Sequence, residues 1–131
     1  MARTLVTPIQ KRFADVDAFR HVNNVAQQSY FDVGKTDFYD RVLGAEVLLG
    51  DLRILTASTS TSYMGQVRYY DDVRVTTCCE RVGTKSITLL QQLLVGDEVR
   101  SESRSVMVVF DFVSQRSEPV PEAWRRRLVE E

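Results

Sequence analysis

One long stretch of helical spacing, with strand-type segments on both sides of it, constrains the fold of this chain more than any other feature. Six small or apolar residues recur at helical spacing within positions 24–42: Ala26, Tyr30, Val33, Gly34, Phe38 and Val42. Five segments have the alternation or the composition of strands: 4–14, 54–63, 73–78, 86–95 and 99–113. This order predicts an α+β domain in which a curved antiparallel five-stranded sheet wraps around one central helix. A short C-terminal helix is expected at 122–129.

Proline and glycine residues refine this arrangement. Pro8 cannot donate a ladder hydrogen bond, so the first strand is expected at a sheet edge, or Pro8 at the start of a strand. Gly34 weakens a helix interior, and its missing side chain indicates that the helix approaches the sheet closely there. Gly83 and Gly96 each stand between two strand-type segments and predict turns. The order of the strands within the sheet does not follow from this pattern.

The last strand-type segment carries an apolar run from Val106 to Phe110. Neighbouring residues of a strand point to opposite faces, so both faces of this strand are apolar and both are expected to be covered. One helix covers only one face of a sheet. The other face is therefore expected to meet a second copy of the chain, and the sequence predicts a homodimer or homotetramer.

Composition bounds the class of protein. The chain has 131 residues, which suits one domain spanning 1–131. A net charge of −1 gives no bulk attraction to nucleic acid or to an acidic membrane surface. No apolar run suggests a signal peptide or a membrane span. Cys78 and Cys79 are adjacent and would point to opposite faces of a strand, so reduced thiols and a cytoplasmic location are expected.

Several familiar catalytic motifs are absent from the sequence. There is no G-x-S-x-G elbow for a serine hydrolase, no phosphate-binding P-loop and no G-x-G-x-x-G. One histidine and two adjacent cysteines do not make a familiar zinc site, so no metal is expected.

Polar residues instead gather between the first strand and the predicted helix. Within ten residues the chain places two carboxylates, its only histidine and two asparagines: Asp15, Asp17, His21, Asn23 and Asn24. A helix N-terminus presents unpaired N–H donors that stabilise an oxyanion, and a nearby carboxylate can attack a carbonyl or deprotonate water. The same residue types are common in turns and helix caps. On spacing alone Asp15 and one asparagine are expected to be structural, and a lone histidine is more often structural than catalytic.

The segment Phe13-Ala-Asp-Val-Asp-Ala-Phe-Arg-His-Val-Asn-Asn24 resembles the signature of the 4-hydroxybenzoyl-CoA thioesterase family of hotdog proteins. The resemblance continues through 30–38, 106–111 and 119–121, and so covers nearly the whole chain. It implies a hotdog fold and hydrolysis of an acyl-CoA thioester to free acid and CoA. CoA is then part of the substrate, and no separate cofactor is expected.

The resemblance also implies roles for individual residues. Asp17 would be the catalytic carboxylate, acting as nucleophile or as general base. The backbone N–H near Asn24 would polarise the thioester carbonyl, while His21 and Asn23 would shape the site. The family usually places this site between two subunits, and basic side chains at its rim usually meet the CoA phosphates.

Two departures from the family pattern bear on specificity. Arg20 stands where many relatives have glycine, and it could contact a CoA phosphate, an acidic acyl group or only water. Gln27 and Gln28 occupy a helical stretch that is often apolar in relatives, so an acyl pocket lined by either would be unusually polar. Three further basic residues are candidates for phosphate contacts or for surface solvation: Arg68, Arg81 and Lys85.

Two other functions share these features. One is a non-catalytic hotdog module that binds acyl-CoA or an acyl carrier protein, although such a binder has no need of Asp17. The other is a purely structural subunit of an oligomer, in which Arg20 could close the pocket. The identity of the acyl group does not follow from the sequence.

Overall fold

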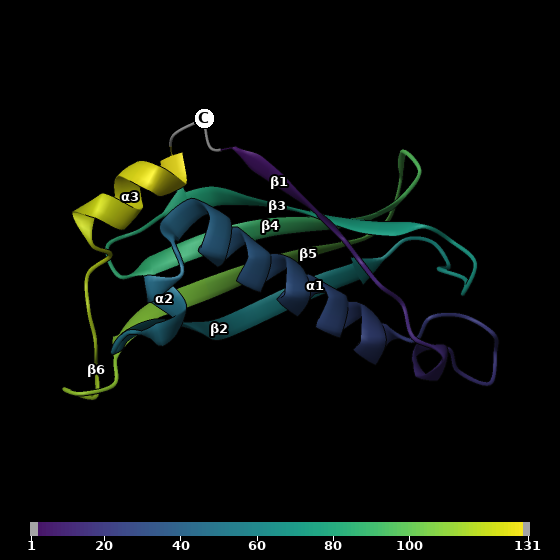
Figure 1. Ribbon diagram of the computed structural model, residues 1–131, viewed down its shortest axis with the longest axis horizontal. Coiled ribbons are helices and arrows are strands. Elements are labelled where there is room, and N and C mark those ends of the chain that lie inside the picture. Colours follow the sequence, from purple (N-terminus) through teal and green to yellow (C-terminus); the bar gives the residue numbers. More distant parts are fainter. Residues whose placement is uncertain (1–2, 130–131) are drawn as a thin grey trace.

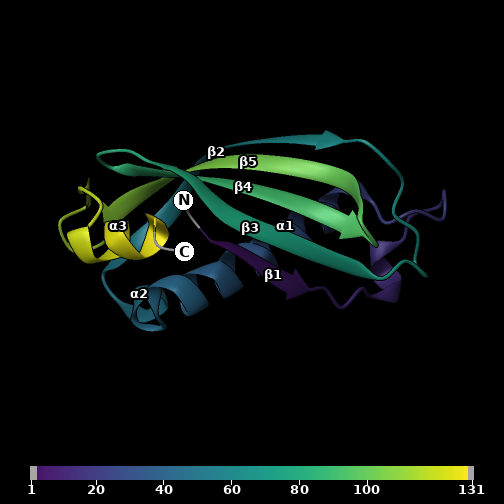
Figure 2. The same cartoon turned by 90° about the horizontal axis from the view of Figure 1, so that it is seen from above.

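The computed structural model describes residues 3–129 of the chain, and its central feature is an antiparallel sheet curved around one long helix (Figures 1 and 2). The strands of the sheet are β1 (Thr4–Pro8), β2 (Leu52–Tyr63), β3 (Val73–Val82), β4 (Ser86–Val95) and β5 (Glu98–Asp111). Their order across the sheet is β1-β3-β4-β5-β2, and all neighbours are antiparallel. A two-residue strand, β6 (Arg116–Ser117), pairs with the end of β5.

Within residues 3–129, four helical segments lie between β1 and β2, and a fifth follows β6. A short 3-10 helix, η1 (Phe13–Asp15), precedes the long helix α1 (Asn24–Phe38). The chain then continues through a π-helical segment, η2 (Tyr39–Leu43), and a single turn of helix, α2 (Glu46–Leu49). The C-terminal helix α3 (Glu122–Val129) covers one end of the sheet (Figure 1). None of the described helices is long and apolar enough to span a membrane.

Helix α1 begins where the sequence predicts and buries most of the predicted stripe. The side chain of Asn23 accepts a hydrogen bond from the Ala26 amide at 2.7 Å and caps the first turn. A Cβ atom built at Gly34 would lie 2.8 Å from Val75 Cγ1, so only glycine lets the helix come this close to the sheet. Val33, assigned to the buried stripe from its spacing, is half exposed instead, because it faces outward beside β1.

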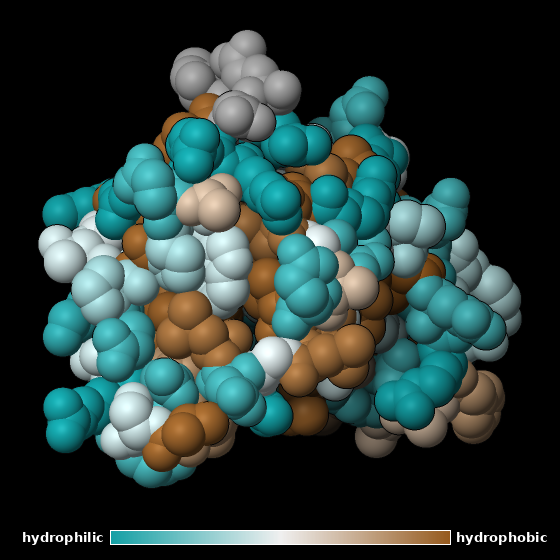
Figure 3. All heavy atoms as spheres, turned by 60° about the vertical axis from the view of Figure 1, so that its left-hand side comes forward, coloured by the Kyte–Doolittle hydropathy of each residue, from teal (hydrophilic) through white to brown (hydrophobic). Residues whose placement is uncertain are grey.

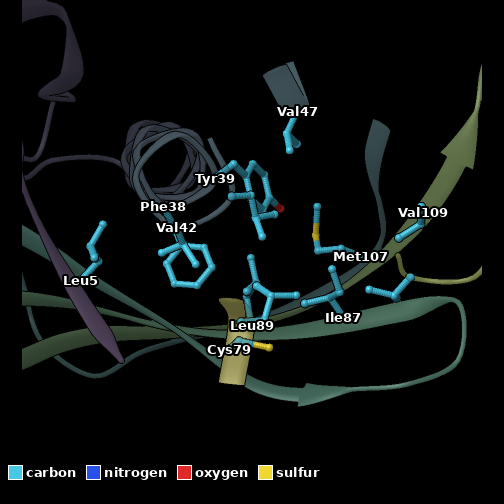
Figure 4. Packing of buried hydrophobic residues seen from close by; sticks show 13 residues of the cluster. Leu5, Phe38, Tyr39, Val42, Val47, Cys79, Ile87, Leu89, Met107 and Val109 are labelled. Atoms are coloured by element: carbon cyan, nitrogen blue, oxygen red, sulfur yellow. The ribbon is translucent and has the colours of Figure 1, made fainter. Parts of the chain in front are cut away.

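Two apolar clusters fill the space between the helical segments and the sheet. In the first, Phe38, Tyr39 and Val42 from the helical side meet Ile87 and Leu89 of the sheet (Figure 4). In the second, Tyr30 and Phe31 of α1 meet strands β3 and β4. These clusters lie at the two ends of α1, and burial of their apolar area is the main stabilising contribution to the fold.

Helix α1 packs mainly on β1, β3 and β4, so it does not cover the whole concave face of the sheet. Several inward-pointing residues of β2, Thr59 among them, stay exposed. Strand β2 is also an edge strand, and the side opposite β5 pairs with no strand among residues 3–129. The edge at β2 is therefore the open side of the fold.

Most of the predicted elements are confirmed, with differences at their ends. β1 is an edge strand, one of the two placements expected from Pro8. It ends at Pro8 and does not continue to residue 14, because η1 turns the chain toward α1. The strand carrying Val106 and Phe110 lies inside the sheet, and its outer face is half-buried within the described chain. Cys78 and Cys79 are free thiols of unequal burial, as expected for neighbours in a strand.

Candidate functional site

Asp17 is the first residue of a tight loop, and its backbone and side chain hydrogen-bond to the residues that end the loop. Its amide donates to the His21 carbonyl at 3.0 Å, and its carbonyl accepts from the Arg20 amide at 3.0 Å. Carboxylate oxygen Oδ1 accepts from the amides of Phe19 at 2.9 Å and His21 at 3.4 Å. The other oxygen, Oδ2, has no hydrogen-bond partner among the described residues, so the carboxylate is held by one oxygen and free at the other.

Arg20 occupies the tip of this loop with φ +66°, in the left-handed region that favours glycine. Glycine suits this backbone conformation best, and here an arginine adopts it. A non-glycine residue in this region costs about 1 kcal/mol, so the loop keeps an arginine at some expense in stability.

A second loop, which joins β2 to β3, packs against the first. The Val22 amide donates to the Val67 carbonyl at 2.7 Å, and an isolated bridge pairs His21 with Arg68. This pairing holds Arg68, Tyr69 and Tyr70 beside the Asp17 loop. These residues are some fifty positions away in the sequence, so their contribution to the site could not be read from spacing.

The two loops enclose a cleft of about 780 Å³. Its lining joins a carboxylate, two guanidinium groups and an imidazole with exposed aromatic rings: Phe13, Val16, Asp17, Phe19, Arg20, His21, Arg68, Tyr69 and Tyr70. Phe19 is 80% and Tyr70 94% exposed. Exposed aromatic rings next to positive charges are typical of a surface that binds a ligand rather than of a packed interior.

Of the residues predicted for the site, Asp17, Arg20 and His21 line this cleft together. Asn23 and Asn24 do not line it, because Asn23 caps helix α1 and Asn24 is the first residue of that helix. The Arg68 candidate lies in the cleft, whereas Arg81 and Lys85 lie at the opposite end of the sheet, in and after β3. A larger cavity of about 970 Å³, between β1 and the outer side of α1, contains none of the predicted site residues.

Asp15 has a different environment from Asp17, although only one residue separates them. It is buried, and its carboxylate accepts hydrogen bonds from the Tyr30 hydroxyl at 2.5 Å and the Arg12 amide at 2.9 Å. Burial raises the pKa of Asp15, but these hydrogen bonds and the Arg12 charge outweigh it and hold the pKa below its ordinary value. Its carbonyl accepts from the Asn23 amide at 3.0 Å. Asp15 therefore ties the loop to α1, which confirms the structural role expected from spacing.

The start of α1 offers the donors that an oxyanion needs. The side chain of Asn23 accepts a hydrogen bond from the amide of Ala26, while the amides of Asn24 and Val25 donate to no acceptor within residues 3–129. Asn24 and Val25 are both exposed. A helix N-terminus with free, exposed amides stabilises negative charge, because the peptide dipoles add along the helix.

On its side facing β2, the helix start meets polar side chains. Gln28 donates through Nε2 to Thr61 Oγ1 at 2.8 Å and to the Tyr63 hydroxyl at 2.9 Å. Tyr63 in turn donates to the Asn24 carbonyl at 3.4 Å. The sequence drew attention to Gln28 but not to Thr61 or Tyr63, which become its neighbours only when β2 takes its place at the sheet edge. Within the described part of the chain, no group of His, Cys, Asp and Glu side chains could hold a metal ion.

Comparison with known proteins places this chain in a family. Residues 12–128 match the model of the Thioesterase-like superfamily, and the chain belongs to that superfamily. The fold is the hotdog fold, shared with a predicted thioesterase from Bacillus stearothermophilus at 27% identity and a TM-score of 0.88, over 98% of each chain.

Two further similar proteins extend this comparison. A thioesterase from Thermus thermophilus, solved in complex with coenzyme A and Zn, shares the fold at 24% identity and a TM-score of 0.84, over 94% of this chain and 90% of its own. The uncharacterized protein YsmA of Bacillus subtilis (strain 168) is 28% identical over 83 residues. That match spans 62% of this chain and 54% of YsmA, little more than half of the relative.

Proposed function

We propose that this protein is an acyl-CoA thioesterase of the 4-hydroxybenzoyl-CoA thioesterase type, with Asp17 as its reacting carboxylate. The observation that carries the proposal is the state of that side chain. Asp17 lines an open cleft, is fixed through Oδ1 by two backbone amides, and has Oδ2 free. A carboxylate that is held still but not neutralised by a cation suits a nucleophile or a general base.

The proposed reaction adds water across a thioester. In the general-base route Oδ2 of Asp17 takes a proton from water, the resulting hydroxide attacks the carbonyl carbon, and the carbon–sulfur bond breaks. The thiolate leaves as CoA and is protonated, and the acyl group leaves as the free acid. In the nucleophilic route Oδ2 attacks the carbonyl carbon first, and the carbon–sulfur bond breaks to expel the CoA thiolate, which is protonated. Water then hydrolyses the mixed anhydride to the free acid and the aspartate. Both routes place negative charge on the carbonyl oxygen, which the Asn24 amide at the helix start stabilises.

The cleft suits the CoA end of such a substrate. Arg20 and Arg68 form no ion pair among the described residues and are free to meet phosphate groups. The exposed rings of Phe19 and Tyr70 offer faces on which an adenine base can stack. The CoA bound by the Thermus neighbour is consistent with this choice of substrate.

We also propose that the protein forms a dimer through β2. The free edge of this strand presents unpaired backbone groups that another strand can pair with. Exposed apolar residues lie at both of its ends, Leu49 and Val113 near the start and Met64 near the finish. The end carrying α2 and α3 shows apolar side chains on its surface (Figure 3).

A two-fold axis near the middle of β2 would make the strands antiparallel and place each apolar end against the opposite end of the partner. The partner would then border the helix start of the first copy. Sedimentation at micromolar concentration should give twice the chain mass of 15.0 kDa, and a particle of 15.0 kDa would contradict the pairing.

The test of the function is release of thiol and free acid from a panel of acyl-CoA thioesters. The thiol-releasing activity should co-elute with the protein through gel filtration, which excludes a contaminating host enzyme. Equal amounts of thiol and acid are expected. If the protein binds acyl-CoA saturably but releases no thiol from any member of the panel, it is the non-catalytic binding module and the thioesterase proposal is wrong.

A further inference from the structure

The concave face between the start of α1 and the open edge carries a row of polar side chains, here called the hydroxyl strip. It consists of Gln28, Thr59, Thr61, Tyr63, Ser103 and Ser105. Thr61 and Ser103 lie 3.0 Å apart through their hydroxyl oxygens, and Thr59 and Ser105 lie 3.2 Å apart. Gln28 bridges this part of the sheet to the helix. The two serines are buried, whereas Thr59 is exposed and Tyr63 is 44% exposed.

The hydroxyl strip adjoins the place where the proposed reaction occurs. Tyr63 contacts the carbonyl of Asn24, and Gln28 lies one helical turn beyond Asn24 on the same side of α1. One turn of helix is roughly 5.4 Å, which is the reach of the first few atoms of an acyl chain. A thioester whose carbonyl meets the Asn24 amide therefore has the hydroxyl strip within reach on one side. The cleft with Arg20 and Arg68 is built from other elements, the loops before α1 and after β2.

The polarity of the strip is not needed for packing. Farther along the same two strands the inward residues are mostly apolar, as where Ile54 pairs with Val109. Thr56 is the exception, and its hydroxyl donates to the sulfur of Met107. Successive inward hydroxyls gather toward the start of α1, where two strip residues of β2 remain exposed. In addition, the amide oxygen of Gln28 accepts no hydrogen bond within residues 3–129, so the strip retains an unused acceptor beside its hydroxyls.

We propose that the hydroxyl strip is the acyl subsite, and that it selects acyl groups carrying a hydroxyl or a similar hydrogen-bonding oxygen near the thioester over saturated alkyl chains. The proposal rests on the thioesterase function proposed above. An alkyl chain laid on the strip displaces water from its hydroxyls and replaces none of the hydrogen bonds. A hydroxylated chain restores them. A site built to hydrogen-bond a substrate hydroxyl discriminates strongly against the analogue that lacks it.

The experiment compares matched substrates and matched variants. The substrates are butanoyl-CoA, 3-hydroxybutanoyl-CoA and octanoyl-CoA, assayed for kcat/KM. The wild-type chain should prefer the hydroxylated substrate to butanoyl-CoA by about ten-fold, the upper end for one net hydrogen bond, and octanoyl-CoA should be the poorest of the three. Thr61→Val keeps the shape of the side chain and removes its hydroxyl, and it should reduce the preference to less than about two-fold.

The control is Thr88→Val, the same exchange on the outer face of β4, which should leave the preference unchanged. If Thr61→Val does not fold, Gln28→Leu serves instead, because leucine is a good helix former and removes the bridging amide. A preference for butanoyl-CoA or octanoyl-CoA in the wild-type chain would overturn the proposal, as would an unchanged preference in Thr61→Val.

A binding measurement separates this proposal from the function on which it rests. Ketone analogues, in which a methylene group replaces the thioester sulfur, are not hydrolysed, and their Kd ratio reports the acyl preference alone. Tighter binding of the hydroxylated analogue with no turnover of any thioester would contradict the thioesterase function and retain the subsite. Rapid hydrolysis together with equal Kd values for the two analogues would retain the thioesterase and contradict the subsite.

Discussion

The inner face of β5 changes its chemistry halfway along the strand. Its first half presents Ser101, Ser103 and Ser105, and its second half presents Met107 and Val109. All five side chains are buried, so the difference is not one of solvent exposure. The second half packs against η2 and α3, and the first half lies beneath Gln27 and Gln28 at the beginning of α1.

This comparison indicates a division of roles between the two ends of the molecule. The apolar half stabilises the fold by burying hydrocarbon, and this contribution does not depend on the direction of any one contact. The polar half contributes less to stability and offers directed hydrogen bonds beside the start of α1. Substitutions in the apolar half should therefore lower the free energy of unfolding and leave the rate of the proposed hydrolysis nearly unchanged. Substitutions near the helix start should lower the rate more than the free energy of unfolding.

The largest expected effect on stability comes from the apolar half. Leu89→Ala removes a fully buried side chain from the first apolar cluster, and it should lower the free energy of unfolding by about 2–5 kcal/mol. Denaturant titration measures the loss. Leu55→Ala, on the outer face of β2 and partly exposed, should cost less than about 1 kcal/mol. Equal losses in the two variants would remove the distinction that this comparison makes.

A smaller effect is expected at Asp15, which ties the Asp17 loop to α1. Asp15→Asn weakens the charge-assisted hydrogen bonds from Tyr30 and Arg12 and should cost about 2 kcal/mol at neutral pH. The folded pKa of Asp15 is lowered, so its contribution is present above the unfolded pKa near 3.9 and is lost as the pH falls through the folded value. Between pH 7 and pH 3 the melting temperature of the variant should therefore fall less steeply than that of the wild type. If the melting temperature of the variant falls with pH as steeply as that of the wild type, titration of groups other than Asp15 causes the loss of stability in acid.

The smallest effect is expected at Arg20. Arg20→Gly suits the left-handed backbone, so the variant should fold with a melting temperature equal to or slightly above that of the wild type. If Arg20 meets a CoA phosphate, KM for acyl-CoA should rise about five-fold, roughly 1 kcal/mol for an exposed ion pair. KM for the acyl-pantetheine thioester, which lacks the nucleotide, should not change. A rise of equal size for both substrates would place Arg20 against the acyl end instead.

Much of the fold follows from residues that act locally. The close approach at Gly34 is decided by a missing side chain and is confirmed by the structure. The sequence allows either asparagine to cap the helix, and the structure shows Asn23 as the cap. Pro8 allows an edge position or the start of a strand, and the structure shows the edge position. The predicted wrapping of a sheet around α1 is also confirmed. The end of the first strand at Pro8 was not predicted, because alternation continues past it while η1 bends the backbone.

The site was only partly predictable, because it is assembled from distant segments. The Asp17 loop is contiguous in sequence and could be located from its motif. Tyr69, Tyr70 and Thr61 join it through the pairing of β2 with β5 and the bridge from His21 to Arg68, which no local pattern specifies. One signal was present: Ser101, Ser103 and Ser105 alternate with charged residues in the first half of the strand, before the apolar run from Val106 to Phe110, and so mark where the inner face becomes polar.

The most direct test of the central claim is the kcat/KM of Asp17→Asn, measured by thiol release beside Asp72→Asn. Asp72 is an exposed carboxylate next to the cleft-forming loop, and its exchange removes the same charge. Both variants should melt within a few degrees of the wild type, because the amide oxygen of the introduced asparagine can still accept from the Phe19 and His21 amides. The account predicts a fall of roughly a thousand-fold for Asp17→Asn and little change for Asp72→Asn. Full activity in a folded Asp17→Asn chain would contradict it.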